Sequence, residues 1–126
     1  MPDQRFRAQD RIRRSADFQR AFRLRRSAGD RLLLVFGHPN GLDHPRLGLS
    51  ISRRTGGAVV RNRWKRLVRE AFRLAREDLP AGFDLVVVPR RGAEPTLEGL
   101  RQSLCKLARR VARERGQAAG LGQDRS

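Results

Sequence analysis

Residues 58–76, AVVRNRWKRLVREAFRLAR, carry the most regular helical pattern in this chain. Wound at about 100° per residue, the segment gathers its apolar side chains on one face, as an amphipathic helix does. The apolar face consists of Val60, Trp64, Leu67, Val68, Ala71, Phe72 and Ala75. The opposite face and its shoulders carry Arg61, Asn62, Arg63, Lys65, Arg66, Arg69, Arg73 and Arg76. We therefore expect a helix that packs one face on a sheet and turns the other toward a negatively charged partner.

Strand patterns lie on both sides of this helix. Residues 46–52 alternate between large apolar and small side chains, and residues 83–88 form an apolar, valine-rich run. A strand, a helix and a further strand predict a βαβ unit with parallel strands. The small face of the first strand, Gly48, Ser50 and Ser52, would either leave a trough whose hydroxyls bond phosphate or sugar, or admit a packed helix.

Three further segments complete one predicted domain over residues 11–115. Ser15 can cap a helix that runs to about residue 25, residues 31–37 form a strand pattern, and Thr96 can cap a last helix. Residues 1–10 are polar and basic, and we expect them to form a flexible arm. The Gly-, Ala- and Gln-rich residues 116–126 predict a disordered tail.

The charge of the chain indicates a polyanionic partner. The formal net charge is +16 and the pI is about 11.9, far from what solubility alone requires. Lys65 and Lys106 are the only lysines, and arginine binds phosphate in two places with its planar fork. An arginine-favouring genome would produce the same bias without changing the net charge. No segment approaches the roughly 20 apolar residues of a membrane span, so we expect a cytoplasmic protein without a membrane partner.

The chain lacks the residue patterns of a catalytic site. Cys105 is alone, which excludes an internal disulfide and an all-cysteine zinc site. His38, His44 and Asp43 lie in one expected loop, where solvated histidines or a metal cluster are the alternatives. Nucleophile-elbow, P-loop and zincin motifs are missing. We therefore predict no catalytic side chain, no metal bound by the protein alone and no small-molecule substrate.

Two segments outside the central helix are candidates for nucleic-acid contact. Residues 53–57, RRTGG, form a basic loop that leads into a helix start, and free N–H groups beside arginines favour phosphate. Phe18 and Phe22 are four residues apart and share a helix face. They are either core anchors or an aromatic ledge on which unpaired bases stack.

The run LGLSISRRTGGAVVRNRWKRLVREAF at residues 47–72 resembles the protein subunit of bacterial ribonuclease P. Residues 61–63, Arg-Asn-Arg, match the family's signature, with Lys65, Arg66 and Arg69 behind them. The similarity continues upstream to DFQRAF at residues 17–22 and downstream through Arg90 into the last helix, and so covers roughly residues 11–113.

The resemblance implies both a fold and an activity. The implied fold is α+β, a small single-domain α/β sandwich with a central mixed sheet and about three helices. Its βαβ crossover is left-handed, against the right-handed rule that holds in about 98% of cases. The implied particle is a ribozyme, whose catalytic RNA subunit removes the 5′ leader from precursor tRNA by Mg²⁺-assisted hydrolysis while the protein binds RNA.

The resemblance also assigns residues. Those matching the contact with the RNA subunit are Arg53, Arg54, Arg61, Asn62, Arg63, Lys65, Arg66 and Arg69. Those matching the cleft that holds the single-stranded leader are Phe18, Phe22, Phe36, Ser50, Ser52 and Arg90. Two positions depart from the family pattern: Phe36 stands where tyrosine is frequent, and Gly57 stands where asparagine is frequent.

Two other functions are compatible with parts of the sequence. A small ribosomal or nucleoid protein would coat nucleic acid through charge, without a 5′ leader preference. A protein-only nuclease would need clustered carboxylates, whereas Asp78, Asp84, Glu94 and Glu98 are scattered near the expected element ends.

Overall fold

The computed structural model describes residues 6–24 and 26–121, without the side chains of residues 22–24 and 114–121. Its elements follow the expected order, with one additional short strand and three short 3₁₀ turns. They are η1 (Ala8–Asp10), α1 (Ser15–Leu24), β1 (Ser27–Gly29), β2 (Leu33–Pro39), β3 (Arg46–Leu49), η2 (Arg53–Thr55), α2 (Ala58–Ala75), η3 (Arg76–Asp78), β4 (Phe83–Pro89) and α3 (Leu97–Leu121).

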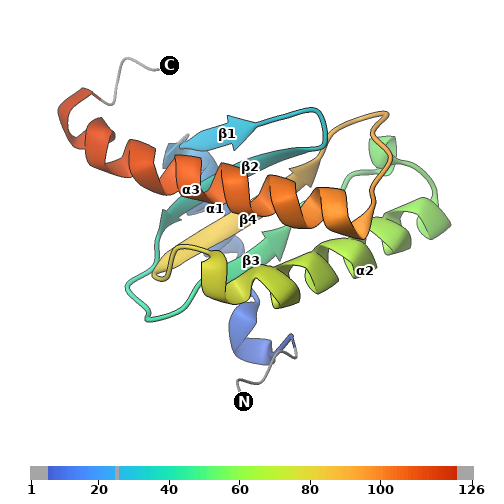
Figure 1. Cartoon of the computed structure of the whole chain (residues 1–126), viewed down its shortest axis with the longest axis horizontal. Coiled ribbons are helices and arrows are strands. Elements are labelled where there is room, and N and C mark those ends of the chain that lie inside the picture. The colour runs from blue at the N-terminus through green and yellow to red at the C-terminus, as the bar shows by residue number, and fades with distance from the viewer. Residues whose placement is uncertain (1–5, 25, 122–126) are drawn as a thin grey trace.

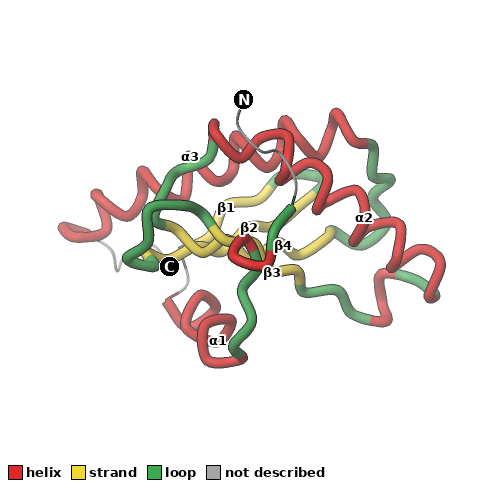
Figure 2. Tube along the Cα trace, turned by 90° about the horizontal axis from the view of Figure 1, so that it is seen from below, coloured by secondary structure: helices red, strands yellow, loops and turns green. Residues whose placement is uncertain are grey.

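The four strands form one mixed sheet in the order β1-β2-β4-β3. β2 pairs antiparallel with β1 and with β4, and β3 pairs parallel with β4. Helices α2 and α3 cover one face of the sheet, and α1 lies on the other (Figures 1 and 2). This arrangement confirms the expected α+β sandwich with a mixed sheet and a βαβ unit.

The crossover from β3 through α2 to β4 is left-handed. In Figure 1, α2 lies on the viewer's side of the sheet, both strands point toward the upper right, and β4 lies above β3. If the strands are turned to point upward with α2 still in front, β4 lies to the left of β3. A right-handed connection would place it to the right, so the structure has the handedness that the family resemblance implied.

The main core lies between the sheet and the helix pair. Trp64, Val68 and Phe72 of α2 are fully buried there with the apolar stripe of α3, and removal of such large side chains from water is the principal stabilising contribution. Val60 was expected in this face but is 43% exposed. The reason is that the first turn of α2 extends beyond the strands (Figure 1).

The described parts of the predicted arm and tail differ from the prediction, whereas residues 1–5 and 122–126 of these segments lie outside the described residues. From Phe6 onward the amino-terminal segment packs on the fold: the Phe6 ring meets Phe72 edge-on at 5.7 Å, and buried Asp10 forms an ion pair with Arg76 at 2.9 Å. Residues 6–10 therefore belong to the packed domain rather than to a flexible arm, because burying an aromatic ring and a paired carboxylate holds them in place. At the other end α3 continues to Leu121, past the expected start of the tail.

The strand predicted over residues 46–52 ends earlier, at Leu49. Ser52 does not extend the strand because its hydroxyl accepts a hydrogen bond from the Arg54 N–H and so caps η2. Among the described residues, every helix is too short or too polar to span a bilayer.

Candidate nucleic-acid interface

A cationic surface covers η2 and the amino-terminal two thirds of α2. It will be called the α2 basic surface, and it consists of Arg53, Arg54, Arg61, Asn62, Arg63, Lys65, Arg66 and Arg69. Arg61 and Lys65 are half-buried and the others are exposed. Within the described part of the chain, none of its cations forms an ion pair with a carboxylate. Their charges therefore remain available to an external polyanion.

The loop before α2 is held in a defined shape. Gly56 has φ +149°, a conformation that favours glycine, and a Cβ built there would lie 2.8 Å from Val60 Cγ1. Arg61 Nε donates a hydrogen bond to the Gly56 carbonyl oxygen at 3.1 Å. Arg61 thus stabilises the loop that carries Arg53 and Arg54, in addition to contributing charge.

On the opposite side of the sheet, Phe18 of α1 lies over a gap in the side-chain layer. Phe36, Val86 and Gly48 are direct neighbours across β2, β4 and β3, so they share one face. A Cβ on Gly48 would lie 2.7 Å from the Phe18 ring. The small residue therefore lets the helix approach, and the trough is filled by an aromatic ring at this position.

The same face continues beyond α1 as a partly uncovered floor. Leu34 and Val88 are the next pair on this face, Ser50 follows Gly48 by two residues, and all three are half-buried. Arg90 borders the floor: its Nε donates to the Asp30 carbonyl oxygen at 3.1 Å, and a Cβ on Gly29 would lie 2.5 Å from its Nη2. We call Leu34, Val88, Ser50 and Arg90 the open end of the sheet.

The predicted leader-binding residues fall into three groups. Phe18, Phe36, Ser50 and Arg90 lie on or beside this one face. Phe18 is half-buried and packs against the small cluster of Ile12, Ala21 and Val86, so it combines an anchoring contact with partial exposure. Ser52 is exposed and lies at the junction with η2. The Phe22 side chain lies outside the described residues.

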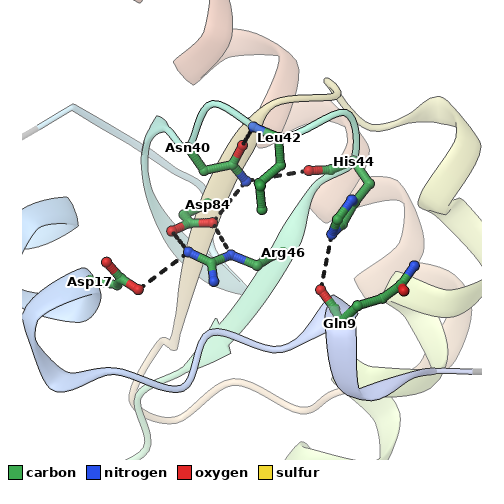
Figure 3. Close-up of polar contacts among 7 residues, drawn as sticks. All are labelled: Gln9, Asp17, Asn40, Leu42, His44, Arg46 and Asp84. Carbon is green, nitrogen blue, oxygen red and sulfur yellow. Dashed lines mark hydrogen bonds and ion pairs between the residues drawn. The ribbon is translucent and has the colours of Figure 1, made fainter.

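A charged network that was not predicted from the sequence lies at the other end of this face (Figure 3). Asp84 of β4 is completely buried. It accepts hydrogen bonds from Arg46 Nε at 2.8 Å and Nη2 at 2.7 Å, and from Asn40 Nδ2 at 2.9 Å. Arg46 Nη2 also donates to Asp17 Oδ2 of α1 at 3.3 Å. The hydrogen bonds from Arg46 to Asp84 raise the pKa of Arg46 further, so the guanidinium stays charged.

A signal for this network was present in the sequence. Asp84 stands alone within an apolar strand, and a buried carboxylate requires a charged or hydrogen-bonding partner. Arg46 begins the strand that pairs with it. The third member of the network, Asp17, could not be predicted from the sequence. Its contact with Arg46 depends on where α1 packs on the sheet.

The two histidines of the expected loop are separated in the structure. The His38 ring is buried in β2, whereas His44 contacts the Asp43 carboxylate through Nδ1 at 3.0 Å and the Gln9 carbonyl oxygen through Nε2 at 3.1 Å. Within residues 6–24 and 26–121, no three His, Cys, Asp or Glu side chains form a group that could hold a metal ion.

A shallow hollow of about 480 Å³ lies elsewhere, on the outer side of α3. Polar and cationic side chains line it together with Cys105. Burial raises the pKa of the Cys105 thiol, against the opposing effect of Arg109, which disfavours the reactive thiolate. The residues that line the hollow all lie on α3, which covers the face of the sheet opposite α1 (Figure 2).

Comparisons with known proteins agree on one family. A family model described as Ribonuclease P matches residues 6–112. The ribonuclease P protein component of Brevibacillus brevis is 39% identical over 103 residues, covering 80% of this chain and 82% of that protein. The component of Azotobacter vinelandii is 48% identical over 89 residues, covering 69% and 68%.

Solved structures give the same result. The RNase P protein from Thermotoga maritima superposes with a TM-score of 0.72 at 35% identity, covering 79% of this chain and 96% of that one. The Staphylococcus aureus RNase P protein gives a TM-score of 0.69 at 34% identity, covering 82% and 94%.

Proposed function

The chain belongs to the ribonuclease P protein family and is a protein component of this endoribonuclease, and we propose from this premise that it acts by binding RNA rather than by supplying a catalytic side chain. The observation that carries the proposal is that one short segment joins the two candidate surfaces along the chain. Ser50 and Ser52 follow the floor beside Phe18 and lead directly into Arg53 and Arg54 of η2, which the α2 basic surface includes.

The α2 basic surface would hold the catalytic RNA subunit. Its guanidinium groups can each bind phosphate oxygens in pairs, and the exposed members have no competing carboxylate among the described residues. Glu70 is the acidic residue next to this surface, and it is engaged by Arg73. Phosphate contacts of this kind fix the register of a protein on a nucleic acid without reading its sequence.

The face of the sheet beside α1 would hold the 5′ leader of precursor tRNA, and we call its residues Phe18, Phe36, Ser50 and Arg90 the proposed leader face. Unpaired bases stack on aromatic side chains, which Phe18 and Phe36 supply. Ser50 can donate to phosphate or sugar oxygens, and Arg90 supplies a cation at the border. Since this binding is to a segment that mature tRNA lacks, it would raise affinity for the substrate over the product.

In this proposal the reaction itself belongs to the RNA subunit, and Mg²⁺ is held by that RNA. The protein's cations would reduce the repulsion between leader and ribozyme phosphates and so favour local Mg²⁺ occupancy. Its remaining contribution would be orientation of the scissile bond through leader binding.

The alternative of a ribosomal or nucleoid protein is not favoured, because the family match covers most of the chain. It differs in an observable way: a protein that coats nucleic acid by charge has no dependence on a 5′ leader.

Reconstitution tests the proposal. The protein alone should leave precursor tRNA uncut, and adding it to the cognate catalytic RNA should restore cleavage at a Mg²⁺ concentration too low for the RNA alone. The reconstituted particle should also bind precursor tRNA more tightly than mature tRNA. Cleavage by the protein alone, or an absence of rescue, would contradict the proposal.

A further inference from the structure

Asp17 joins α1 to the sheet immediately beside the aromatic residue of the leader face. It precedes Phe18 in the chain, and its Oδ2 lies 3.3 Å from Arg46 Nη2. Both side chains are largely withdrawn from solvent, with 16% of Asp17 and 21% of Arg46 exposed. Reduced exposure strengthens such a pair relative to a fully hydrated one.

Arg46 is itself fixed from the other side. Two of its nitrogens bond both carboxylate oxygens of Asp84, which is completely buried in the central strand β4. Moving the guanidinium would leave a buried carboxylate without its cation, which is strongly unfavourable. Arg46 is therefore held in one position relative to the sheet, and Asp17 connects α1 to it (Figure 3).

Among the described side chains, the other contacts of α1 with the sheet lack this directionality. Phe18 and Ala21 rest on Val86 through apolar contacts, and hydrophobic burial is not directional. Apolar packing alone would tolerate small shifts of α1 along the sheet. A charge-assisted hydrogen bond has a preferred geometry, so the Asp17–Arg46 contact selects one position.

We propose that Asp17 is a positioning residue for 5′-leader binding: through Arg46 and Asp84 it fixes α1 so that the Phe18 ring stays over Gly48 and borders the open end of the sheet at a constant distance. The inference rests on the proposed function of that face. Preorganisation of this kind raises affinity by reducing the ordering that binding would otherwise require.

The competing explanation is that the ion pair only stabilises the fold. The variant Asp17→Asn tests the positioning role against this explanation. Asparagine keeps the shape of the side chain and removes its charge, so the ion pair is weakened without a change of side-chain size. The measured quantity is leader preference, the ratio of the Kd for mature tRNA to the Kd for precursor tRNA in the reconstituted particle. We expect Asp17→Asn to lower this ratio about three- to tenfold, the factor expected for one weakened charged hydrogen bond, without changing the Kd for mature tRNA.

Three variants serve as controls. Glu98→Gln removes the same charge from an exposed pair with Arg101 on α3, and Asp10→Asn removes it from a buried pair with Arg76. Asp17→Glu keeps the negative charge at residue 17 on a side chain that is one methylene longer. Thermal unfolding of each free protein gives the accompanying loss of stability.

The outcomes are distinguishable. Reduced leader preference in Asp17→Asn, with preference retained in Glu98→Gln, Asp10→Asn and largely in Asp17→Glu, supports the positioning role. An unchanged ratio in Asp17→Asn overturns it, and so does an equal reduction in Asp10→Asn at a similar loss of stability. If the unsubstituted protein has no leader preference, the proposed function of this face itself fails.

Discussion

The ring of Phe18 occupies the space that a side chain at position 48 would need. A Cβ on Gly48 would lie 2.7 Å from Phe18 Cε1 and Cζ, and 3.0 Å from Ile12 Cδ1. The position of the Phe18 ring therefore depends on the lack of a side chain at Gly48. The depth of the leader face at this point depends on the absence of one methyl group.

Gly48→Ala should displace the Phe18 ring from the sheet. The methyl group must be accommodated by rotation of the ring or movement of α1, and overpacking of this kind costs about 1–3 kcal/mol. We expect a lower midpoint of urea unfolding and a several-fold loss of leader preference. The double variant Gly48→Ala/Phe18→Leu should recover part of the stability, because leucine lacks the clashing ring atoms. Additive losses in the double variant would contradict the direct contact.

Arg63→Ala and Arg61→Ala should have separable effects. Arg63 is exposed and unpaired among the described residues, so its loss should weaken assembly with the RNA subunit and lower the slope of log K against log salt by about 1. Its effect on stability should stay within about 0.5 kcal/mol.

Arg61→Ala should also destabilise the loop, because the hydrogen bond to Gly56 is lost, at a cost of about 1 kcal/mol. The double replacement should flatten the salt dependence further. Arg101→Ala on α3, whose cation is already paired with Glu98, provides the control. An unchanged salt slope in Arg63→Ala would exclude a direct phosphate contact by this residue.

The contrast between these two surfaces explains what the sequence could predict. The α2 basic surface lies on one helix and the loop before it, so periodicity alone places most of its residues on one side. Prediction of the leader face would require knowledge of the registers in which β2, β4 and β3 pair. Alternation assigns Phe36 and Ser50 to faces of their own strands, but only the pairing of Phe36 with Val86, and of Val86 with Gly48, brings them together.

Strand β1 and the charged network were not predicted from the sequence, and the physical causes are of the same kind. Strand β1 is the short segment SAG, which lacks the β-branched and aromatic residues that mark a strand and is held by pairing with β2. The network of Asp17, Arg46 and Asp84 joins three separate elements. The local sequence pattern does not show how close these elements lie to one another, although a lone aspartate in an apolar strand indicates that a partner exists.

Gly57→Asn should stabilise α2. Gly57 is the N-cap residue and provides no side-chain hydrogen bond, its φ of −73° suits any residue, and a Cβ there would meet nothing within 4 Å. Asparagine can accept a hydrogen bond from a first-turn N–H group, which is worth a few tenths of a kcal/mol relative to glycine. Urea unfolding should detect the increase. Gly57→Ala is the control without a capping group, and equal stabilisation by alanine would exclude capping as the cause.

His38 should make the protein less stable in mild acid. Its side chain is 3% exposed, and neither ring nitrogen has a hydrogen-bond partner among the described residues. Burial lowers the pKa of His38 below its ordinary value of 6.5; Asp84 opposes this shift, and the cations Arg20 and Arg26 add to it. The folded protein therefore keeps the ring neutral at a pH where the unfolded chain already binds a proton.

The lowered pKa of His38 makes the free energy of unfolding depend on pH. Below about pH 6.5 the unfolded state takes up a proton that the folded state does not, so the free energy of unfolding falls as the pH decreases toward the folded-state pKa. The slope cannot exceed about 1.4 kcal/mol per pH unit for one group. His38→Leu should remove this decline between pH 7 and 5 and raise stability at pH 5, because it also removes two unsatisfied polar atoms. Urea unfolding at several pH values measures the effect, with His44→Gln as the control that retains His38. A decline that persists unchanged in His38→Leu would assign the acid sensitivity to another group.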